Sequence, residues 1–349
     1  MTAVRIGDRL VGAGCPCLVI AEAGVNHNGS GVLAHKLVDL AARAGADAVK
    51  FQTFSADRLA SRSAPKAAYQ RDTTGTAESQ YDMLRRLELS PEIHRELVDH
   101  CRQSGLMFLS TPFDEASVDL LDGLGVPAFK MSSGEITNVS LLRHVAAKGK
   151  PIIMSTGMST LAEVQSAVGV LGDAGASQVV LLHCVSRYPA DPAEANLRAM
   201  RTMADATSLP VGYSDHTMGI EVALTAVALG AVVLEKHFTS SRALAGPDHR
   251  CSLEPAELTK LVHGVRAVES ALGHGRKEPT EGEAAVAAVA RRSLVAARAI
   301  PAGTVLTEDL ITSRRPGTGL PPDMLPRVLG RRVRMAVDAG TLLTLDLLT

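Results

Sequence analysis

The chain has 349 residues, enough for a large buried core, and 46% of them are apolar. Its formal net charge of -1 gives no bulk electrostatic attraction toward nucleic acid or an anionic membrane, so we expect neither as a partner. Arg5, Asp8 and Arg9 interrupt the start of the chain, and no later apolar stretch is long enough for a membrane span. We therefore expect a cytoplasmic protein without a signal peptide.

Eight short apolar runs alternate with amphipathic helical patterns along the first three quarters of the chain. This alternation predicts a parallel sheet with right-handed crossovers, and eight repeats favour closure into a (β/α)8 TIM barrel. The predicted strands cover residues 18–23, 48–53, 106–110, 128–131, 152–155, 179–184, 211–213 and 232–237. Because polar motifs follow each run, they should meet at the carboxyl end of the barrel, where such enzymes carry their active site.

Two segments do not fit this alternation of strands and helices. The stretch 55–76, between the second and third predicted strands, is either a lid over the site or a solvated loop.

After a barrel domain at 1–276, a polar and alanine-rich linker at 277–290 leads to a small β-rich domain at 291–349, with β-like runs at 293–297 and 333–337. Nine arginines against five acids give this tail a net charge of +4, which suits an anionic ligand or an acidic partner surface.

Two histidines lie at the ends of neighbouring predicted strands. His216 follows the seventh strand and His237 ends the eighth, so both imidazoles can face one point above the barrel and share a divalent metal ion. Hydrogen bonding within the loops is the alternative role for these histidines. Imidazole nitrogens with a possible Glu22 carboxylate would suit Mn, Mg, Zn or Fe.

Lys50 and Lys130 lie inside apolar runs at the ends of the second and fourth predicted strands. A buried ammonium is costly unless it meets an anion, so the pair indicates a phosphate or carboxylate ligand. Serines at the same rim can complete a phosphate cradle: these are Ser133, Ser155 and Ser214. Glu22 and Glu135 could act as a general base or as counter-ions to the lysines.

The ordered motifs resemble a known family. AEAGVNHNG, KFQTF, STPFD, KMSSGEITN, STGM, LLHCVSRYP, GYSDHT and EKHFT are similar to those of the N-acetylneuraminate (sialic acid) synthase family, and the tail motifs RRSLVAARAIPAGTVLTEDL and RRPGTGL resemble its C-terminal antifreeze-like (SAF) domain. The resemblance implies metal-dependent condensation of phosphoenolpyruvate with N-acetylmannosamine, giving N-acetylneuraminate and phosphate. It implies Mn²⁺, or alternatively Mg²⁺, as the cofactor.

The resemblance also assigns roles to residues. His216 and His237 would hold the metal, and Glu22 would position or deprotonate water. The family motifs place Glu22, Lys50, Lys130 and Glu135 among the catalytic residues, and they place Gln52, Thr111, Ser133, Ser155, Ser186, Tyr188, Ser214, Asp248 and Arg315 among the substrate-binding residues. Arg315 would reach into the partner's barrel of a domain-swapped homodimer.

The same motifs also fit other acceptor sugars and a non-catalytic role. Legionaminic and pseudaminic acid synthases carry much the same barrel motifs and would use a diacetamido-trideoxyhexose instead of N-acetylmannosamine. The aldose phosphate used by related octulosonate and heptulosonate phosphate synthases is disfavoured by the SAF-like tail. A non-catalytic sugar-binding protein is the alternative of another class, although it would not require the lysines, histidines and glutamates to be present together.

Overall fold

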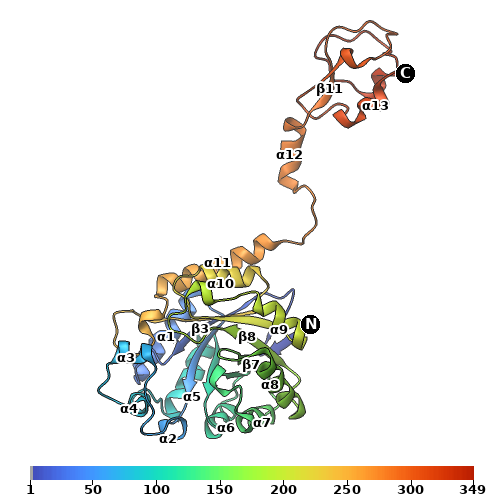
Figure 1. The fold of residues 1–349 in the computed structure, drawn as a ribbon. Coiled ribbons are helices and arrows are strands. Elements are labelled where there is room, and N and C mark those ends of the chain that lie inside the picture. Colours follow the sequence, from blue (N-terminus) through green and yellow to red (C-terminus); the bar gives the residue numbers. More distant parts are fainter. Residues whose placement is uncertain (1–2) are drawn as a thin grey trace. The chain divides into compact units, whose positions relative to one another are not determined.

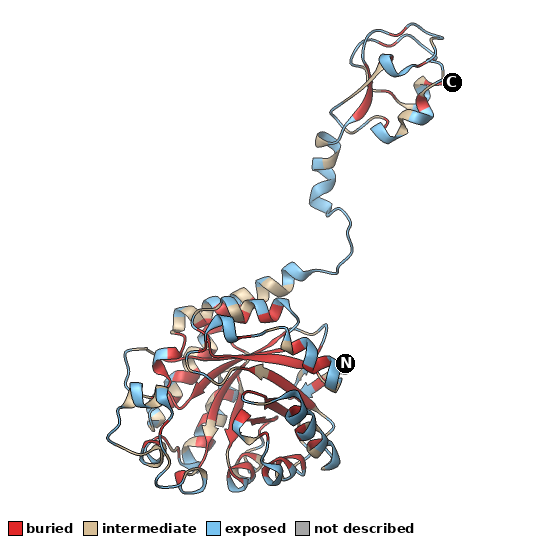
Figure 2. Cartoon of the chain, in the orientation of Figure 1, coloured by how far each residue is buried: buried red, intermediate tan, exposed pale blue. Residues whose placement is uncertain are grey.

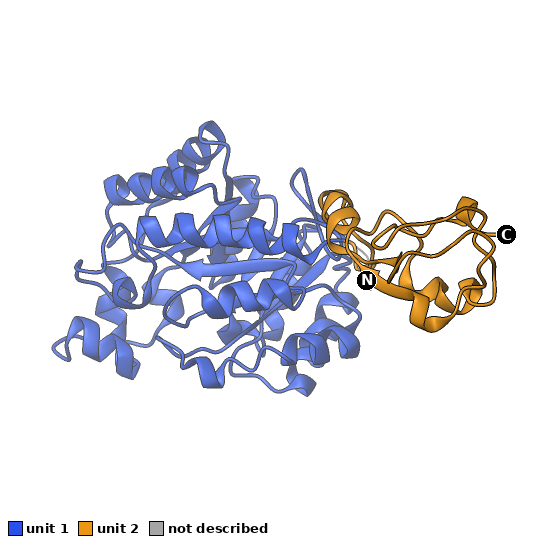
Figure 3. Ribbon diagram, turned by 90° about the horizontal axis from the view of Figure 1, so that it is seen from above, with its two compact units in different colours: residues 1–273 blue, residues 274–349 orange. Residues whose placement is uncertain are grey.

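The computed structural model describes residues 3–349, and the chain divides into two compact units, residues 1–273 and 274–349 (Figure 3). Each unit has a hydrophobic core of its own. Within residues 3–349, no helix combines the length and the apolar content needed to cross a membrane.

The first unit is a barrel of eight parallel strands, which confirms the predicted fold class. The strands are β3 (Leu18–Gly24), β4 (Ala48–Thr53), β5 (Met107–Pro112), β6 (Phe129–Met131), β7 (Ile152–Ser155), β8 (Val179–Cys184), β9 (Val211–Asp215) and β10 (Val233–His237). Their hydrogen-bonded order is β5-β4-β3-β10-β9-β8-β7-β6, and β5 and β6 at the two ends are in contact. The sheet is therefore nearly closed, with each strand beside its neighbours in the chain.

Helices cover the outside of the barrel (Figure 1). They are α1 (Gly31–Ala44), α5 (Pro91–Gln103), α6 (Glu115–Gly123), α7 (Val139–Ala146), α8 (Leu161–Asp173), α9 (Ala199–Thr207), α10 (Glu221–Ala228) and α11 (Pro255–Leu272). Local sequence sets several ends: Ser30 caps the first turn of α1, and Gly45 ends it with a left-handed φ of 77°. The helix faces toward the strands are buried, whereas the outer faces are exposed (Figure 2).

An N-terminal hairpin closes the bottom of the barrel. Strands β1 (Val4–Ile6) and β2 (Arg9–Val11) pair antiparallel, and their side chains join a core inside the barrel with residues such as Leu18, Ile153 and Leu182. This hairpin was not predicted, since two three-residue strands leave little periodic signal. With apolar residues filling the lower interior, polar side chains of the strands can gather only toward the carboxyl ends.

Three short helices follow β4: α2 (Ala56–Leu59), α3 (Ala68–Thr74) and α4 (Gln80–Arg85). They form an insertion, residues 55–87, with a small core of its own in which Met83 and Leu87 pack with Phe54 and Val25. Residues 55–76 are therefore folded and not merely a solvated loop, and their action as a lid stays a prediction.

The second unit begins with α12 (Glu281–Ala290), inside the segment predicted as a linker. Strands β11 (Ser293–Ala296) and β12 (Ile311–Arg314) pair antiparallel, and α13 (Leu325–Val328) packs with them. The expected β-run at 333–337 is wrong, because only isolated bridges form at Val333 and Val337. Met335 between them is 58% exposed, so the chain bends outward instead of continuing as a strand.

Candidate active site

Polar side chains form one layer across the upper interior of the barrel. Each strand contributes one buried member: Glu22 (β3), Lys50 (β4), Thr111 (β5), Lys130 (β6), Ser155 (β7), Cys184 (β8), Ser214 (β9) and Glu235 (β10). Lys130 and Glu235 come from strands on opposite sides of the barrel, and their charged groups lie 3.6 Å apart. The layer therefore spans the interior, directly above the apolar layer that the hairpin seals.

The two lysines are held by carboxylates and hydroxyls. The Lys50 ammonium lies 2.8 Å from Glu22 Oε2 and 3.9 Å from Glu235 Oε2, and it donates to Thr111 Oγ1 at 2.9 Å. Lys130 donates to Ser155 Oγ at 2.7 Å. Two ammonium groups thus share two carboxylates in a space closed to bulk water.

Burial and charge shift the pKa values within this layer. Burial, with Glu235 adding to it, raises the pKa of Glu22 to about 7 despite the attraction of Lys50. Burial also lowers the pKa of Lys130, whereas for Lys50 the two glutamates outweigh burial and raise its pKa. Burial would raise the pKa of Glu235, but Lys130 and Lys50 outweigh it and hold that pKa below its ordinary value. The pKa values of Glu22 and Glu235 are thus shifted in opposite directions, which is typical of carboxylates in catalytic sites.

Serine hydroxyls from the loops after β6 and β8 and from strand β9 lie around this layer. Ser133 accepts a hydrogen bond from the Gly157 amide at 2.9 Å, and its Oγ lies 3.2 Å from Cys184 Sγ. A Cβ atom at Gly157 would lie only 2.2 Å from Ser186 Oγ, so this close approach requires glycine. Ser214 donates to Glu235 at 3.0 Å from the neighbouring strand.

The two candidate metal-binding histidines lie side by side above this layer. The ring centres of His216 and His237 are 5.7 Å apart, and Tyr188 packs on both rings at 4.2 and 5.7 Å. His216 Nδ1 bonds to the Val185 carbonyl at 2.7 Å, which leaves its Nε2 free of the proton when the ring is neutral. Burial lowers the pKa of both rings, that of His237 well below its ordinary value, so both are neutral at pH 7.

This pair fits a loosely held divalent cation. His237 Nδ1 is buried without a hydrogen-bond partner, and neutral imidazole nitrogens are metal ligands. Among residues 3–349, no group of three or more His, Cys, Asp or Glu is arranged to hold a metal ion. A cation at this position would therefore take its remaining ligands from water and substrate.

The other predicted site residues lie around the rim. Gln52 is half-buried beside Thr111 in the β4–β5 ladder, and Glu135 accepts from Asn138 at 2.7 Å without contacting the lysines. Asp248 is buried, its Oδ1 has no partner, and burial raises its pKa to about 6. Arg315 belongs to the second unit, where it is exposed and donates to the Ala290 carbonyl at 2.9 Å.

Sequence reasoning missed Glu235, although a signal was present. It precedes His237 by two residues in a strand, and residues two apart share one face.

On the opposite face of the same strands, Lys236 and Asp215 form a fully buried ion pair at 2.5 Å, and Lys236 also donates to the Thr217 carbonyl. Each member of this pair is the chain neighbour of one candidate metal-binding histidine, so the pair joins the two strand ends that carry them.

Comparisons with known proteins agree with this geometry. Residues 37–277 match the model of the NeuB family, and residues 291–349 match the SAF domain, as predicted for the tail. An N,N'-diacetyllegionaminic acid synthase of Legionella pneumophila is 46% identical over 95% of this chain and 94% of its own length. One of Campylobacter jejuni is 48% identical over 90% of this chain and 95% of its own. A solved N-acetylneuraminic acid synthetase of Leptospira borgpetersenii has a TM-score of 0.72 at 34% identity, covering 82% of this chain and 95% of that one.

Proposed function

The chain belongs to the NeuB family of sialic, legionaminic and pseudaminic acid synthases, and from that premise we propose that it condenses phosphoenolpyruvate with a 2,4-diacetamido-2,4,6-trideoxyhexose. The products would be a nine-carbon 2-keto sugar acid of the legionaminic acid type and inorganic phosphate. The observation that carries this proposal is the buried pair Lys50 and Lys130, set among carboxylates and hydroxyls in a chain so similar to legionaminic acid synthases.

This acceptor replaces the one first expected. The sequence motifs placed N-acetylmannosamine first and the diacetamido sugar second. Identities of 46% and 48% to two N,N'-diacetyllegionaminic acid synthases, against 34% to an N-acetylneuraminic acid synthetase, favour the second acceptor. The reaction class is the same for both, since the two sugars differ away from the reacting aldehyde.

The lysine layer suits phosphoenolpyruvate. In the free protein the charges of Lys50 and Lys130 are balanced by Glu22 and Glu235. When phosphoenolpyruvate binds, its phosphate and carboxylate would form ion pairs with the two ammonium groups in place of the glutamates. Ser155 and the other serine hydroxyls would be further hydrogen-bond donors. Fixed cations in a water-excluding site stabilise such charge better than water does.

The bond changes follow from the two substrates. The C3 electron pair of phosphoenolpyruvate forms a carbon–carbon bond with the aldehyde carbon, whose oxygen takes a proton. Water adds to C2, and cleavage of the C2–O bond releases phosphate and leaves the 2-keto group. Glu22, with a pKa near 7, can accept the proton of that water and return it, because both of its protonation states are populated near neutral pH.

His216 and His237 would hold a divalent cation, for which we propose Mn²⁺ ahead of Mg²⁺. When bound there, such an ion supplies positive charge for the aldehyde oxygen of the acceptor. The protein's own contribution is to keep both rings neutral and buried, and to fix His216 through its bond to Val185. We also propose that Asp248 and Glu135 contact the sugar.

We also propose that the active form is a homodimer in which Arg315 reaches the acceptor bound in the partner's barrel. Its exposed guanidinium and the arginine-rich surface of the second unit support this role. Sedimentation together with an Arg315→Ala variant tests it. Loss of acceptor affinity in an intact dimer is expected, and a fully active monomer would contradict it.

The proposed function is tested by phosphate release from phosphoenolpyruvate with three acceptors: the 2,4-diacetamido-2,4,6-trideoxy sugar, N-acetylmannosamine and arabinose 5-phosphate. Each is assayed with Mn²⁺ or Mg²⁺ and again with EDTA, and the product mass is measured. Release that depends on metal and is fastest with the diacetamido sugar is expected. Preference for N-acetylmannosamine would restore the first expectation, and no release with any acceptor would refute the synthase proposal.

A further inference from the structure

The insertion, residues 55–87, is held firmly against the barrel. Besides its own small core, the Ala56 amide donates to Glu88 at 2.6 Å, and Arg58 pairs with Asp114 at 2.8 Å. At its far side, Thr73 Oγ1 donates to the Pro247 carbonyl at 3.3 Å, which joins the insertion to the loop after β10. The insertion thus bridges loops from different sides of the barrel mouth.

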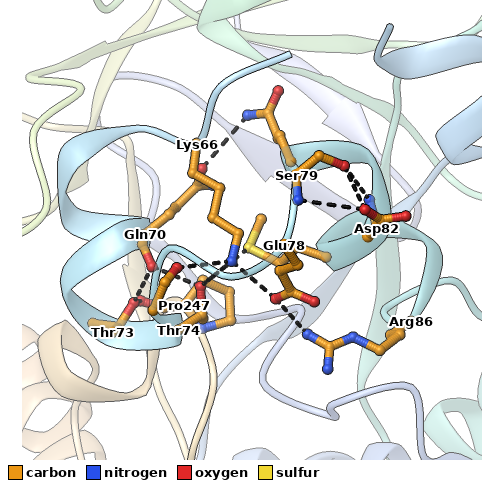
Figure 4. A network of polar contacts seen from close by, with 12 residues as sticks. Lys66, Gln70, Thr73, Thr74, Glu78, Ser79, Asp82, Arg86 and Pro247 are labelled. Carbon is orange, nitrogen blue, oxygen red and sulfur yellow. Dashed lines mark hydrogen bonds and ion pairs between the residues drawn. The ribbon is translucent and has the colours of Figure 1, made fainter. Parts of the chain in front are cut away.

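Lys66 fixes the position of α3 within the insertion. Only 4% of this lysine is exposed, and its ammonium donates to Thr74 Oγ1 at 2.8 Å, to the Gly75 carbonyl at 3.1 Å and to Glu78 Oε1 at 2.9 Å (Figure 4). Glu78 also binds Arg86 at 2.6 Å. A buried ammonium is tolerated only when its hydrogen bonds are satisfied, so this network favours a single placement of α3.

The residue that α3 presents to the site is Tyr69. Its ring stacks on that of Tyr188 with 5.0 Å between centres and 30° between planes, and Tyr188 in turn packs on His216 at 4.2 Å. Burial, with the nearby Asp248 carboxylate adding to it, raises the pKa of Tyr69, so its hydroxyl stays neutral. Two of the chain's four tyrosines therefore form consecutive layers leading outward from the candidate metal-binding histidines.

A polar group without a partner lies close to these rings. Asp248 is buried and its Oδ1 accepts no hydrogen bond, while its charge acts on both Tyr69 and Tyr188. A buried carboxylate oxygen of this kind can accept a hydrogen bond from a ligand. The ring of Tyr69 and the carboxylate of Asp248 together offer an apolar surface beside a hydrogen-bond acceptor.

We infer that Tyr69 is a specificity-determining residue, which forms the outer wall of the acceptor subsite and selects the 4-acetamido, 6-deoxy end of the sugar. The inference rests on the proposed function. With the aldehyde at the histidines, the far end of the open-chain sugar extends outward past Tyr188 to Tyr69. That end carries a methyl group and an acetamido group in the diacetamido acceptor, but only hydroxyls in N-acetylmannosamine.

The chemistry of these groups explains the selection. Moving the methyl groups of the 6-deoxy and acetamido ends from water onto an aromatic ring is favourable. The amide N–H of the acetamido group can donate a hydrogen bond to an acceptor such as Asp248. The hydroxyls of N-acetylmannosamine gain less from the same ring, since they must give up hydrogen bonds to water. Tyr69 should therefore separate the two acceptors and leave phosphoenolpyruvate binding unchanged.

The test compares kcat/KM for both acceptors in full-length wild-type protein and in Tyr69→Ala, Tyr69→Phe and Tyr81→Ala. Tyr81 is the matched control, because it lies in the same insertion and pairs with Asp57 at 2.6 Å. For Tyr69→Ala we expect a loss of about 10- to 100-fold with the diacetamido sugar and less than about 3-fold with N-acetylmannosamine, as for removal of an apolar pocket wall. Tyr69→Phe keeps the ring and should retain the preference, and KM for phosphoenolpyruvate should stay constant throughout.

The outcomes separate the two proposals. If wild-type protein uses the diacetamido sugar but Tyr69→Ala affects both acceptors equally, or neither, the inference about Tyr69 is overturned and the proposed function stands. A similar loss of preference in Tyr81→Ala would also overturn it, because general loosening of the insertion would then be the cause. If wild-type protein does not use the diacetamido sugar at all, both proposals fail.

Discussion

Replacing Glu235 by Gln should destabilise the first unit measurably. Its carboxylate lies 3.6 Å from the Lys130 ammonium and 3.9 Å from that of Lys50. At an effective dielectric constant of about 20, each attraction is worth roughly 4 to 5 kcal/mol, part of which is offset by the cost of burying the carboxylate. We expect a net loss of about 3 kcal/mol, because Glu22 alone would remain to balance two buried cations.

The assay is thermal unfolding with and without inorganic phosphate. A loss of this size lowers the Tm of a unit of this length by roughly 5 to 10 °C. Phosphate should raise the Tm of Glu235→Gln more than that of the wild type, since it restores the missing negative charge beside Lys50 and Lys130. Glu194→Gln is the control: its pair with Arg187 is exposed, so its loss should cost less than about 1 kcal/mol. Equal stabilisation of wild type and Glu235→Gln by phosphate would refute the charge-balance reasoning.

Three further predictions concern the same site. Because the pKa of Glu22 rises from 4.5 to about 7 on folding, the folded protein holds the extra proton, and wild-type stability should fall between about pH 4.5 and 7. Glu22→Gln should flatten that slope in urea unfolding, and an unchanged slope would contradict the assignment. His216→Ala and His237→Ala should each weaken Mn²⁺ binding, measured by electron paramagnetic resonance, whereas retained binding in both would exclude this metal site. Asp215→Asn should cost about 3 to 5 kcal/mol by leaving Lys236 unpaired, and should weaken Mn²⁺ binding by about 10- to 100-fold; loss of stability without loss of Mn²⁺ affinity would limit the pair to a structural role.

Much of the barrel could be predicted because its strands leave a strong local signal. The predicted ranges 48–53, 152–155 and 179–184 coincide with β4, β7 and β8. Shorter elements in the second unit carried less signal, and the expected run at 333–337 failed because its register depends on contacts with distant residues such as Leu348 and Ile300. Strand existence is a local property, whereas strand pairing is a tertiary one.

The polar residues of the site were predictable to a similar extent. Lys50 and Lys130 stand out as charges in apolar runs, and both lie in the buried layer. Glu235 and Lys236 are adjacent and both buried, yet one faces the site and the other faces away. Strands buried on both faces show no polar–apolar alternation, so the only sequence signal for the inward position of Glu235 was its two-residue spacing from His237.

The amino-acid sequence by itself therefore determined the order of strands and helices, the family resemblance and most of the polar residues at the strand ends, since all of these depend on neighbours along the chain. Only the tertiary structure decided that Glu235 balances two lysines from other strands, and that Tyr69 of the insertion stacks on Tyr188 beside the histidines. These contacts join residues far apart in the chain, and their existence depends on closure of the barrel and on the buried hydrogen bonds of Lys66.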